Sequence, residues 1–148
     1  MPFKKYLTAL TLLSLLGMGV SAYLIHQHFK PSGTSFCNVN EYVNCDIVNK
    51  SEYAEISGIP VSVLGFGAYS ILLVLSLAAS LVRYRLPAVT TGALFSAGGL
   101  AFSIYLTGIE FFVLNAICLF CLTSQIFILF IFIIFLFLWL KRSKWRQA

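Results

Sequence analysis

The sequence predicts an all-α membrane protein built as a bundle of four transmembrane helices. Hydrophobic residues make up 59% of the 148 residues and charged residues only 10%, whereas about a quarter of the residues of a soluble domain are charged. Four runs carry no Asp, Glu, Lys or Arg, namely 6–29, 56–82, 86–109 and 111–140. Each exceeds the roughly 20 residues that a helix needs to cross a bilayer. None alternates with the period of a barrel strand, so helices in lipid are expected.

The first expected helix spans about residues 6–28. Lys4 and Lys5 before it resemble the start of a signal peptide, but the apolar run is too long and no small-residue cleavage site follows. A polar outer loop, 30–57, comes next. The second helix is expected at about 59–82, with Pro60 in its first turn, where a missing N–H costs nothing.

Two further helices complete the expected single domain, residues 1–148. A tight inner turn at 83–85 leads to a helix at about 87–109, and a short outer turn near Glu110 leads to one at about 111–140. Small residues lie at positions 65, 67 and 68 and at 97–99. They are expected to let helices approach closely, as small residues do in lipid. Glu110 is expected to suit the N-terminal dipole of the last helix.

Basic residues predict the orientation. Along a four-helix path most of them fall on one side, at positions 4, 5, 83, 85, 141, 142, 144 and 146, whereas Lys30 and Lys50 fall on the other. The positive-inside rule then places both termini in the cytoplasm and the loop 30–57 outside. The net charge of +5 therefore reflects topology, and no nucleic-acid partner is expected.

The four cysteines form two pairs. Cys37 and Cys45 lie in the outer loop as C-x7-C, and Cys118 and Cys121 lie in the last helix as C-x-x-C. Both pairs are near the non-cytoplasmic side, where disulfides persist. A helix that begins near Glu110 would place Cys118 about two turns, or roughly 12 Å, from its outer end.

This arrangement suits electron transfer by disulfide exchange, which needs a thiolate, a disulfide and access between them. Spacing i, i+3 puts Cys118 and Cys121 on one helix face, with Gln125 close to that stripe and Asn115 beside it. The loop pair would react with a water-soluble thiol protein, and the helix pair would react with a lipid-soluble electron acceptor. Three alternatives compete with this reading: inert buried thiols, structural disulfides in a tetraspan scaffold, and a zinc site, which the spacings do not match. No metal is expected.

Several residues together resemble one known family. Cys37-x7-Cys45, Ser51, the stretch Gly58-Ile59-Pro60-x-Ser62-x-x-Gly65 and Cys118-x-x-Cys121 are similar in order and spacing to the vitamin K epoxide reductase (VKOR) family, over about residues 6–140. The resemblance implies a four-helix bundle around a quinone pocket that the outer loop caps. Bacterial members are similar in role to DsbB: they reoxidise a DsbA-like, thioredoxin-fold protein and reduce a quinone. No fused thioredoxin domain follows here, so a separate partner is expected.

The resemblance also implies roles for individual residues. Cys37 would exchange with the partner, and Cys45 would pass electrons to Cys118. Cys121 would face the quinone, of ubiquinone, menaquinone or vitamin K type, and form a transient adduct with it. Ser51 would hold the loop over the site, unless it is only a helix cap.

Two departures from the animal enzymes count against epoxide reduction. Gln125 stands where they usually carry a tyrosine, and Pro60-Val61-Ser62 stands where they tend to carry an asparagine. Ser62, Asn115 and Gln125 are expected to bind or support the quinone, with contact between helices as the alternative for Gln125. His26 and His28 are expected at the membrane rim, with proton transfer to the quinol as the alternative.

The sequence thus predicts a quinone-dependent thiol-disulfide oxidoreductase of a bacterial inner membrane. The alternative activity is reduction of vitamin K epoxide or quinone in the membrane of the endoplasmic reticulum.

Overall fold

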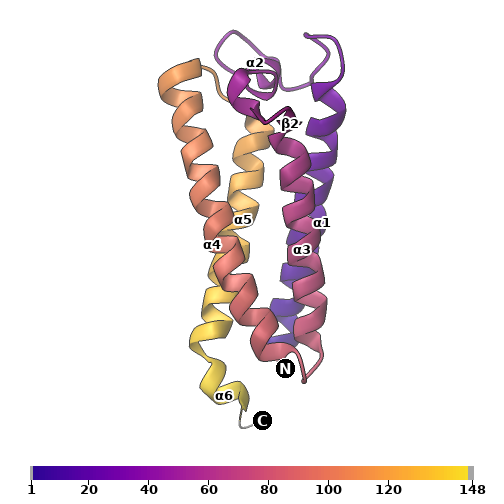
Figure 1. The fold of residues 1–148 in the computed structure, drawn as a ribbon, viewed down its shortest axis with the longest axis vertical. Helices are drawn as coiled ribbons and strands as arrows, with labels where there is room; N and C mark the ends of the chain where they lie inside the picture. The colour runs from indigo at the N-terminus through magenta and orange to yellow at the C-terminus, as the bar shows by residue number, and fades with distance from the viewer. Residues whose placement is uncertain (1, 147–148) are drawn as a thin grey trace.

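Four long helices run side by side in an elongated bundle. The structure is a computed structural model that describes residues 2–146, so residues 1, 147 and 148 of the expected domain lie outside it. Within the described range the long helices are α1 (Pro2–His28), α3 (Val61–Ser80), α4 (Arg85–Ile109) and α5 (Leu119–Leu140). Each is long and apolar enough to cross a membrane. Both termini lie at one end of the bundle and α2 lies at the other (Figure 1). The expected fold class is confirmed.

The helix boundaries differ most from expectation between α4 and α5. α4 does not end near Glu110: a π-helical turn, η2 (Glu110–Leu114), extends it. Asn115 then adopts a left-handed conformation, with φ of 48°, which asparagine tolerates better than most residues. α5 begins only at Leu119. The expectation of a helix from residue 111 was therefore wrong, because an uncharged run does not reveal a turn between two helices.

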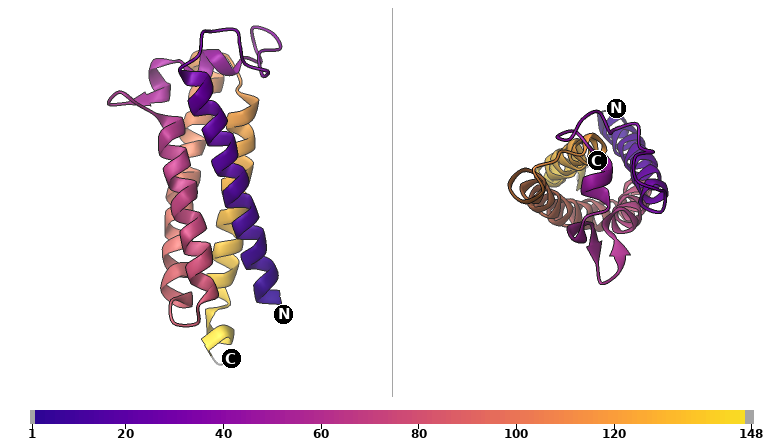
Figure 2. Two further views of the ribbon diagram at one scale, coloured as in Figure 1. Left: turned by 90° about the vertical axis from the view of Figure 1, so that its right-hand side faces the viewer. Right: turned by 90° about the horizontal axis from the view of Figure 1, so that it is seen from above.

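The outer loop is structured. It contains α2 (Cys45–Asn49), the 3-10 helix η1 (Glu52–Ala54) and a hairpin of two short antiparallel strands, β1 (Glu55–Ile56) and β2 (Ile59–Pro60). Ser57 and Gly58 form the hairpin turn with positive φ values of 54° and 80°, the backbone pattern of a two-residue type I′ turn. We call residues 45–60 the cap, because α2 lies over the centre of the bundle when it is seen from above (Figure 2). At the opposite end, α6 (Arg142–Arg146) follows α5.

Close packing between the long helices depends on two glycines. A Cβ at Gly17 would lie 2.3 Å from Cε1 of Tyr69, and one at Gly92 would lie 2.5 Å from Cε1 of Phe135. The expected small-residue contacts are present at Gly65 and Gly99, where a Cβ would lie 3.2 Å from Ser21 Oγ and 3.5 Å from Ile128, respectively. They are absent at Gly67 and Gly98, where a Cβ would meet nothing within 4 Å. Which small residues meet another helix depends on how each helix is rotated, and that is set by the whole bundle.

We predict that Gly92→Ala destabilises the protein and that Gly98→Ala does not. The new methyl group would force the buried ring of Phe135 to move, and overpacking of this kind costs about 1–3 kcal/mol. Both variants gain the same helix propensity, so the difference between their thermal unfolding midpoints in detergent isolates the packing effect. Equal midpoints would contradict the packing described here.

Candidate functional site

Three of the four cysteines meet under the cap. Cys37 and Cys45 form a disulfide with a Cα–Cα distance of 5.4 Å, and Cys118 and Cys121 are free thiols. The sulfur atoms of Cys37, Cys45 and Cys118 all lie within 4.8 Å of one another. These three side chains are 3%, 1% and 0% exposed. The fold therefore places a helix thiol directly beside the loop disulfide with which it could exchange.

A short backbone pairing sets this proximity. Val43 and Ile117 form an isolated parallel bridge: the Asn44 N–H donates to the Ile117 carbonyl at 3.1 Å, and the Ile117 N–H donates to the Tyr42 carbonyl at 2.7 Å. The two paired segments lead directly into Cys45 and Cys118. Two segments far apart in the sequence are thereby held side by side.

The loop before α2 folds over the disulfide. The Asn44 side chain accepts a hydrogen bond from the Ile47 N–H and so caps α2. The Asp46 carboxylate accepts from the Gly33 N–H at 2.7 Å and from Nδ2 of Asn38 at 2.6 Å. Cys37 is buried, so a soluble protein would reach its sulfur only after the segment 33–38, which Asp46 holds, moves aside. Sequence alone gave no sign of this burial.

Cys118 occupies the N-cap position of α5 and does not lie two turns inside a helix, so the expected depth of roughly 12 Å was wrong. Its Sγ accepts a hydrogen bond from the Cys121 N–H at 3.2 Å. The break at Asn115 thus places the Cys118 sulfur at the N-terminal end of α5, beside the loop disulfide.

Glu110 is buried beside this N-terminus. It is 3% exposed, and its Oε2 accepts a hydrogen bond from the Cys118 N–H at 3.1 Å. The expected contact with the dipole of the last helix is present, but the acid belongs to the preceding segment, η2, which folds back toward α5. The sequence showed only an acid in a short turn, so its burial was missed.

An apolar cavity of about 410 Å³ lies beneath the cap. Small-molecule sites typically enclose about 300–1,000 Å³. Cys121 lines the cavity together with Ser51 and Tyr53 of the cap and with Phe102 and Glu110. Cys118 is not among the described residues of its wall. The two cysteines therefore have different neighbours, because Cys118 lies beside the loop disulfide and Cys121 lines the cavity.

The polar residues expected at the quinone divide into two groups. Ser51 and Ser62 line the cavity, whereas Asn115 and Gln125 are not among its described lining residues. Gln125 Oε1 accepts a hydrogen bond from Thr107 Oγ1, which is the contact between helices given above as its alternative. Asn115 ends η2. Ser51 donates to the Val48 carbonyl at 2.8 Å, so its hydroxyl bonds within the cap itself.

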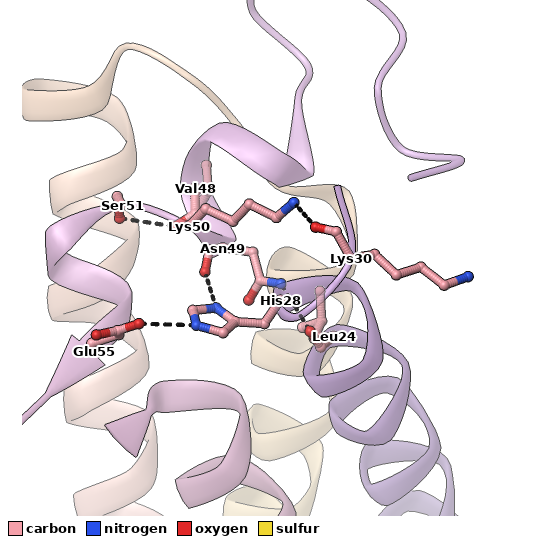
Figure 3. Close-up of polar contacts among 8 residues, drawn as sticks. All are labelled: Leu24, His28, Lys30, Val48, Asn49, Lys50, Ser51 and Glu55. Carbon is pink, nitrogen blue, oxygen red and sulfur yellow. Dashed lines mark hydrogen bonds and ion pairs between the residues drawn. The ribbon is translucent and has the colours of Figure 1, made fainter. Parts of the chain in front are cut away.

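His28 and Asn49 hold the cap on α1 (Figure 3). One ring nitrogen of His28 lies 2.7 Å from the Asn49 carbonyl and the other lies 2.9 Å from a carboxylate oxygen of Glu55. Asn49 Nδ2 donates to the Leu24 carbonyl at 2.8 Å. His28 was expected at the membrane rim, with proton transfer to the quinol as the alternative. Its anchoring role was missed, because nothing in the sequence shows that residues 49 and 55 fold back to it.

A helical membrane bundle that holds a disulfide, an adjacent thiol pair and an apolar cavity belongs to the class of membrane thiol-disulfide redox proteins. Residues 8–136 match the sequence profile described as the Vitamin K epoxide reductase family. The chain therefore belongs to this family, whose members are membrane oxidoreductases that act with thiol redox partners and quinones. A comparison with curated proteins found no match.

We predict that His28→Ala loosens the cap. The variant loses two hydrogen bonds, each worth about 0.5–1.5 kcal/mol, so amide protection of residues 45–57 should fall roughly tenfold or more in hydrogen-exchange mass spectrometry. His26→Ala is the matched control, since His26 is exposed and the structure gives it no hydrogen bond. Unchanged exchange in the His28 variant would show that the cap is held by other contacts.

Proposed function

We propose that the protein oxidises a soluble dithiol protein and passes the electrons to a quinone in the membrane, and so supports disulfide bond formation. The observation that carries this proposal is the cluster of three sulfur atoms within 4.8 Å, with the fourth cysteine on the wall of the cavity. The partner would be a DsbA-like protein of the thioredoxin fold. A structural scaffold is disfavoured, because the chain belongs to a family of oxidoreductases.

The proposed electron route begins at the loop pair. A partner dithiol reduces the Cys37–Cys45 disulfide and becomes a disulfide itself. The Cys45 thiolate then attacks Cys118 of the oxidised helix pair, giving a Cys45–Cys118 disulfide and a Cys121 thiol. Cys37 resolves that bond, which restores Cys37–Cys45 and leaves two helix thiols. This last pattern, a loop disulfide with free helix thiols, is the one that precedes quinone reduction.

The final step transfers two electrons and two protons. The thiols of Cys118 and Cys121 become a disulfide, and the quinone becomes a quinol. Cys121 is the member of the pair on the cavity wall, and we therefore assign the contact with the quinone to it.

The cavity fits a quinone head group, a flat and largely apolar ring with two carbonyl acceptors. Its wall is mainly apolar, and the buried Ser62 Oγ has no hydrogen-bond partner among the described residues. A buried hydroxyl without a partner costs free energy, and a quinone carbonyl would relieve that cost. Ser51 is the second proposed contact. Asn115 and Gln125 would support the site through the backbone turn and the bond between helices.

We propose a bacterial inner membrane as the location, with both termini in the cytoplasm and the cap outside. Support comes from the basic residues, since the termini and the α3–α4 turn that carries Arg83 lie at the end opposite the cap (Figure 1). Epoxide reduction in the endoplasmic reticulum is disfavoured, because Gln125 replaces the tyrosine of the animal enzymes and bonds to Thr107.

Cys121→Ala should abolish quinone reduction, because Cys118 then has no partner for the helix disulfide. In this variant Cys118 can still attack Cys45 of the loop disulfide and release Cys37 as a thiol. Alkylation of that Cys37 thiol should trap the Cys45–Cys118 disulfide, which mass spectrometry of non-reduced peptides would detect. Cys118→Ala, the control, should lose the activity without that cross-link. Undiminished quinone-dependent oxidation of a dithiol by the Cys121 variant would refute the proposed function.

Ala68→Phe should close part of the cavity. Ala68 lines it, so the added ring should raise the KM for a short-chain ubiquinone by about tenfold or more, a loss of roughly 1.4 kcal/mol in binding. Exchange between Cys45 and Cys118 should persist. Gly67→Phe is the matched control, since a side chain at Gly67 points to open space; an equal effect of both variants would count against a quinone in this cavity.

A further inference from the structure

Reduction of a quinone by two thiols moves two protons as well as two electrons. The cap covers the cavity and the wall is mainly apolar, so thiol protons released there have little water to receive them. Proton transfer in such a site needs a positioned acid or base. On the proposed function, on which this inference rests, a residue of the cavity wall must therefore move the protons.

Glu110 is the carboxylate on the cavity wall. It is buried, and no Lys, Arg or His forms an ion pair with it among residues 2–146. Its Oε2 accepts the Cys118 N–H, whereas Oε1 has no hydrogen bond to any described residue. A buried carboxylate without a positive partner is costly, and ionisable groups retained inside a membrane commonly mark proton or substrate paths.

Helix geometry places Glu110 where such a group would be needed. Ser103, Thr107 and Glu110 recur at helical spacing and all line the cavity, so they form one stripe along the end of α4. Glu110 is the member of that stripe bonded to the C-x-x-C segment. The π-helical turn that begins at Glu110 belongs to a rare class that is frequent at functional sites.

We propose that Glu110 is a catalytic residue that carries protons from the thiols to the quinone. The Glu110 carboxylate takes the proton of the Cys121 thiol, and the thiolate adds to a ring carbon of the quinone to form a carbon–sulfur bond. The Cys118 sulfur then attacks Sγ of Cys121 and releases its own proton. The disulfide forms as the carbon–sulfur bond breaks, and the electron pair of that bond stays on the quinone ring. Glu110 delivers the first proton to one quinone oxygen, and the Cys118 proton follows to the other oxygen through the same carboxylate. Two thiols and one quinone give one disulfide and one quinol, and Glu110 ends as it began.

The competing explanation is structural, since Glu110 could serve only to accept the Cys118 N–H at the start of α5. Glu110→Gln separates the two roles. A glutamine carbonyl has nearly the same shape and still accepts that N–H, but it cannot take up a thiol proton. Glu110→Asp, which keeps the acid on a shorter side chain, is the conservative variant.

The test uses the full chain in lipid nanodiscs, with dithiothreitol as the dithiol and a short-chain ubiquinone as the acceptor. We expect Glu110→Gln to slow quinol formation about 10²–10⁴-fold, the usual contribution of general acid–base catalysis, and Glu110→Asp to recover part of it. Exchange between Cys45 and Cys118, trapped without quinone, should be unchanged in both variants. A rate within about tenfold of wild type in Glu110→Gln, which is less than the usual range, or an equal loss of the quinone-free exchange, would overturn the proposal.

A second readout needs no quinone. In the reduced protein, alkylation of Cys121 by iodoacetamide measures its thiolate. In Glu110→Gln the alkylation rate should fall about tenfold for each unit by which the pH lies below the pKa of the Cys121 thiol, because the thiol can lose its proton only to water. In wild type it should level off, because the proton can pass to Glu110. Identical profiles would overturn the role of Glu110. Failure of the wild-type protein to reduce quinone would instead overturn the proposed function, whatever the profiles show.

Discussion

The redox arrangement depends on one short piece of backbone pairing, the bridge between Val43 and Ile117. A flexible loop would leave the loop disulfide free to sample many positions, and bringing it to the helix pair would cost closure entropy in each catalytic cycle. With the bridge in place, this entropy is lost once, when the protein folds. The nearness of Cys45 and Cys118 is therefore a property of the backbone and does not require side-chain attraction.

The cap serves two needs that oppose each other. A quinone site benefits when water is excluded, since every polar interaction within it then strengthens. A soluble partner, in contrast, needs access to Cys37, which is buried. Different contacts hold the two parts. His28 and Asn49 anchor the cap to α1, whereas hydrogen bonds to Asp46 hold the loop that precedes the cap. Opening of the segment over the disulfide would therefore break the Asp46 contacts and leave the His28 and Asn49 contacts in place.

The irregular segment 110–118 combines several functions in a few residues. The π-helical turn contains the buried Glu110, and the left-handed Asn115 ends that turn. Cys118 then occupies the N-cap position of α5. Non-helical backbone at such a position is tolerated because its polar groups find partners: the Ala116 N–H donates to the Glu110 carbonyl, and the Cys118 N–H donates to the Glu110 side chain. The same hydrogen bonds that make the break possible bring an acid, a thiol and a helix dipole together.

The sequence by itself determined the bundle, because four uncharged runs of sufficient length have few alternatives in lipid. It also favoured disulfide exchange, since the two cysteine pairs resemble those of the VKOR family, while their spacing alone left structural disulfides and buried thiols open. Only the tertiary structure decided which groups meet. The break before Cys118 lies in an apolar run whose hydropathy is the same in a helix or a turn, and Glu110, His28 and Asn49 acquire their roles from partners distant in sequence. The hydropathy pattern within a segment determines which secondary structure that segment can form. Contacts between segments depend instead on the rotation and register of all the helices together.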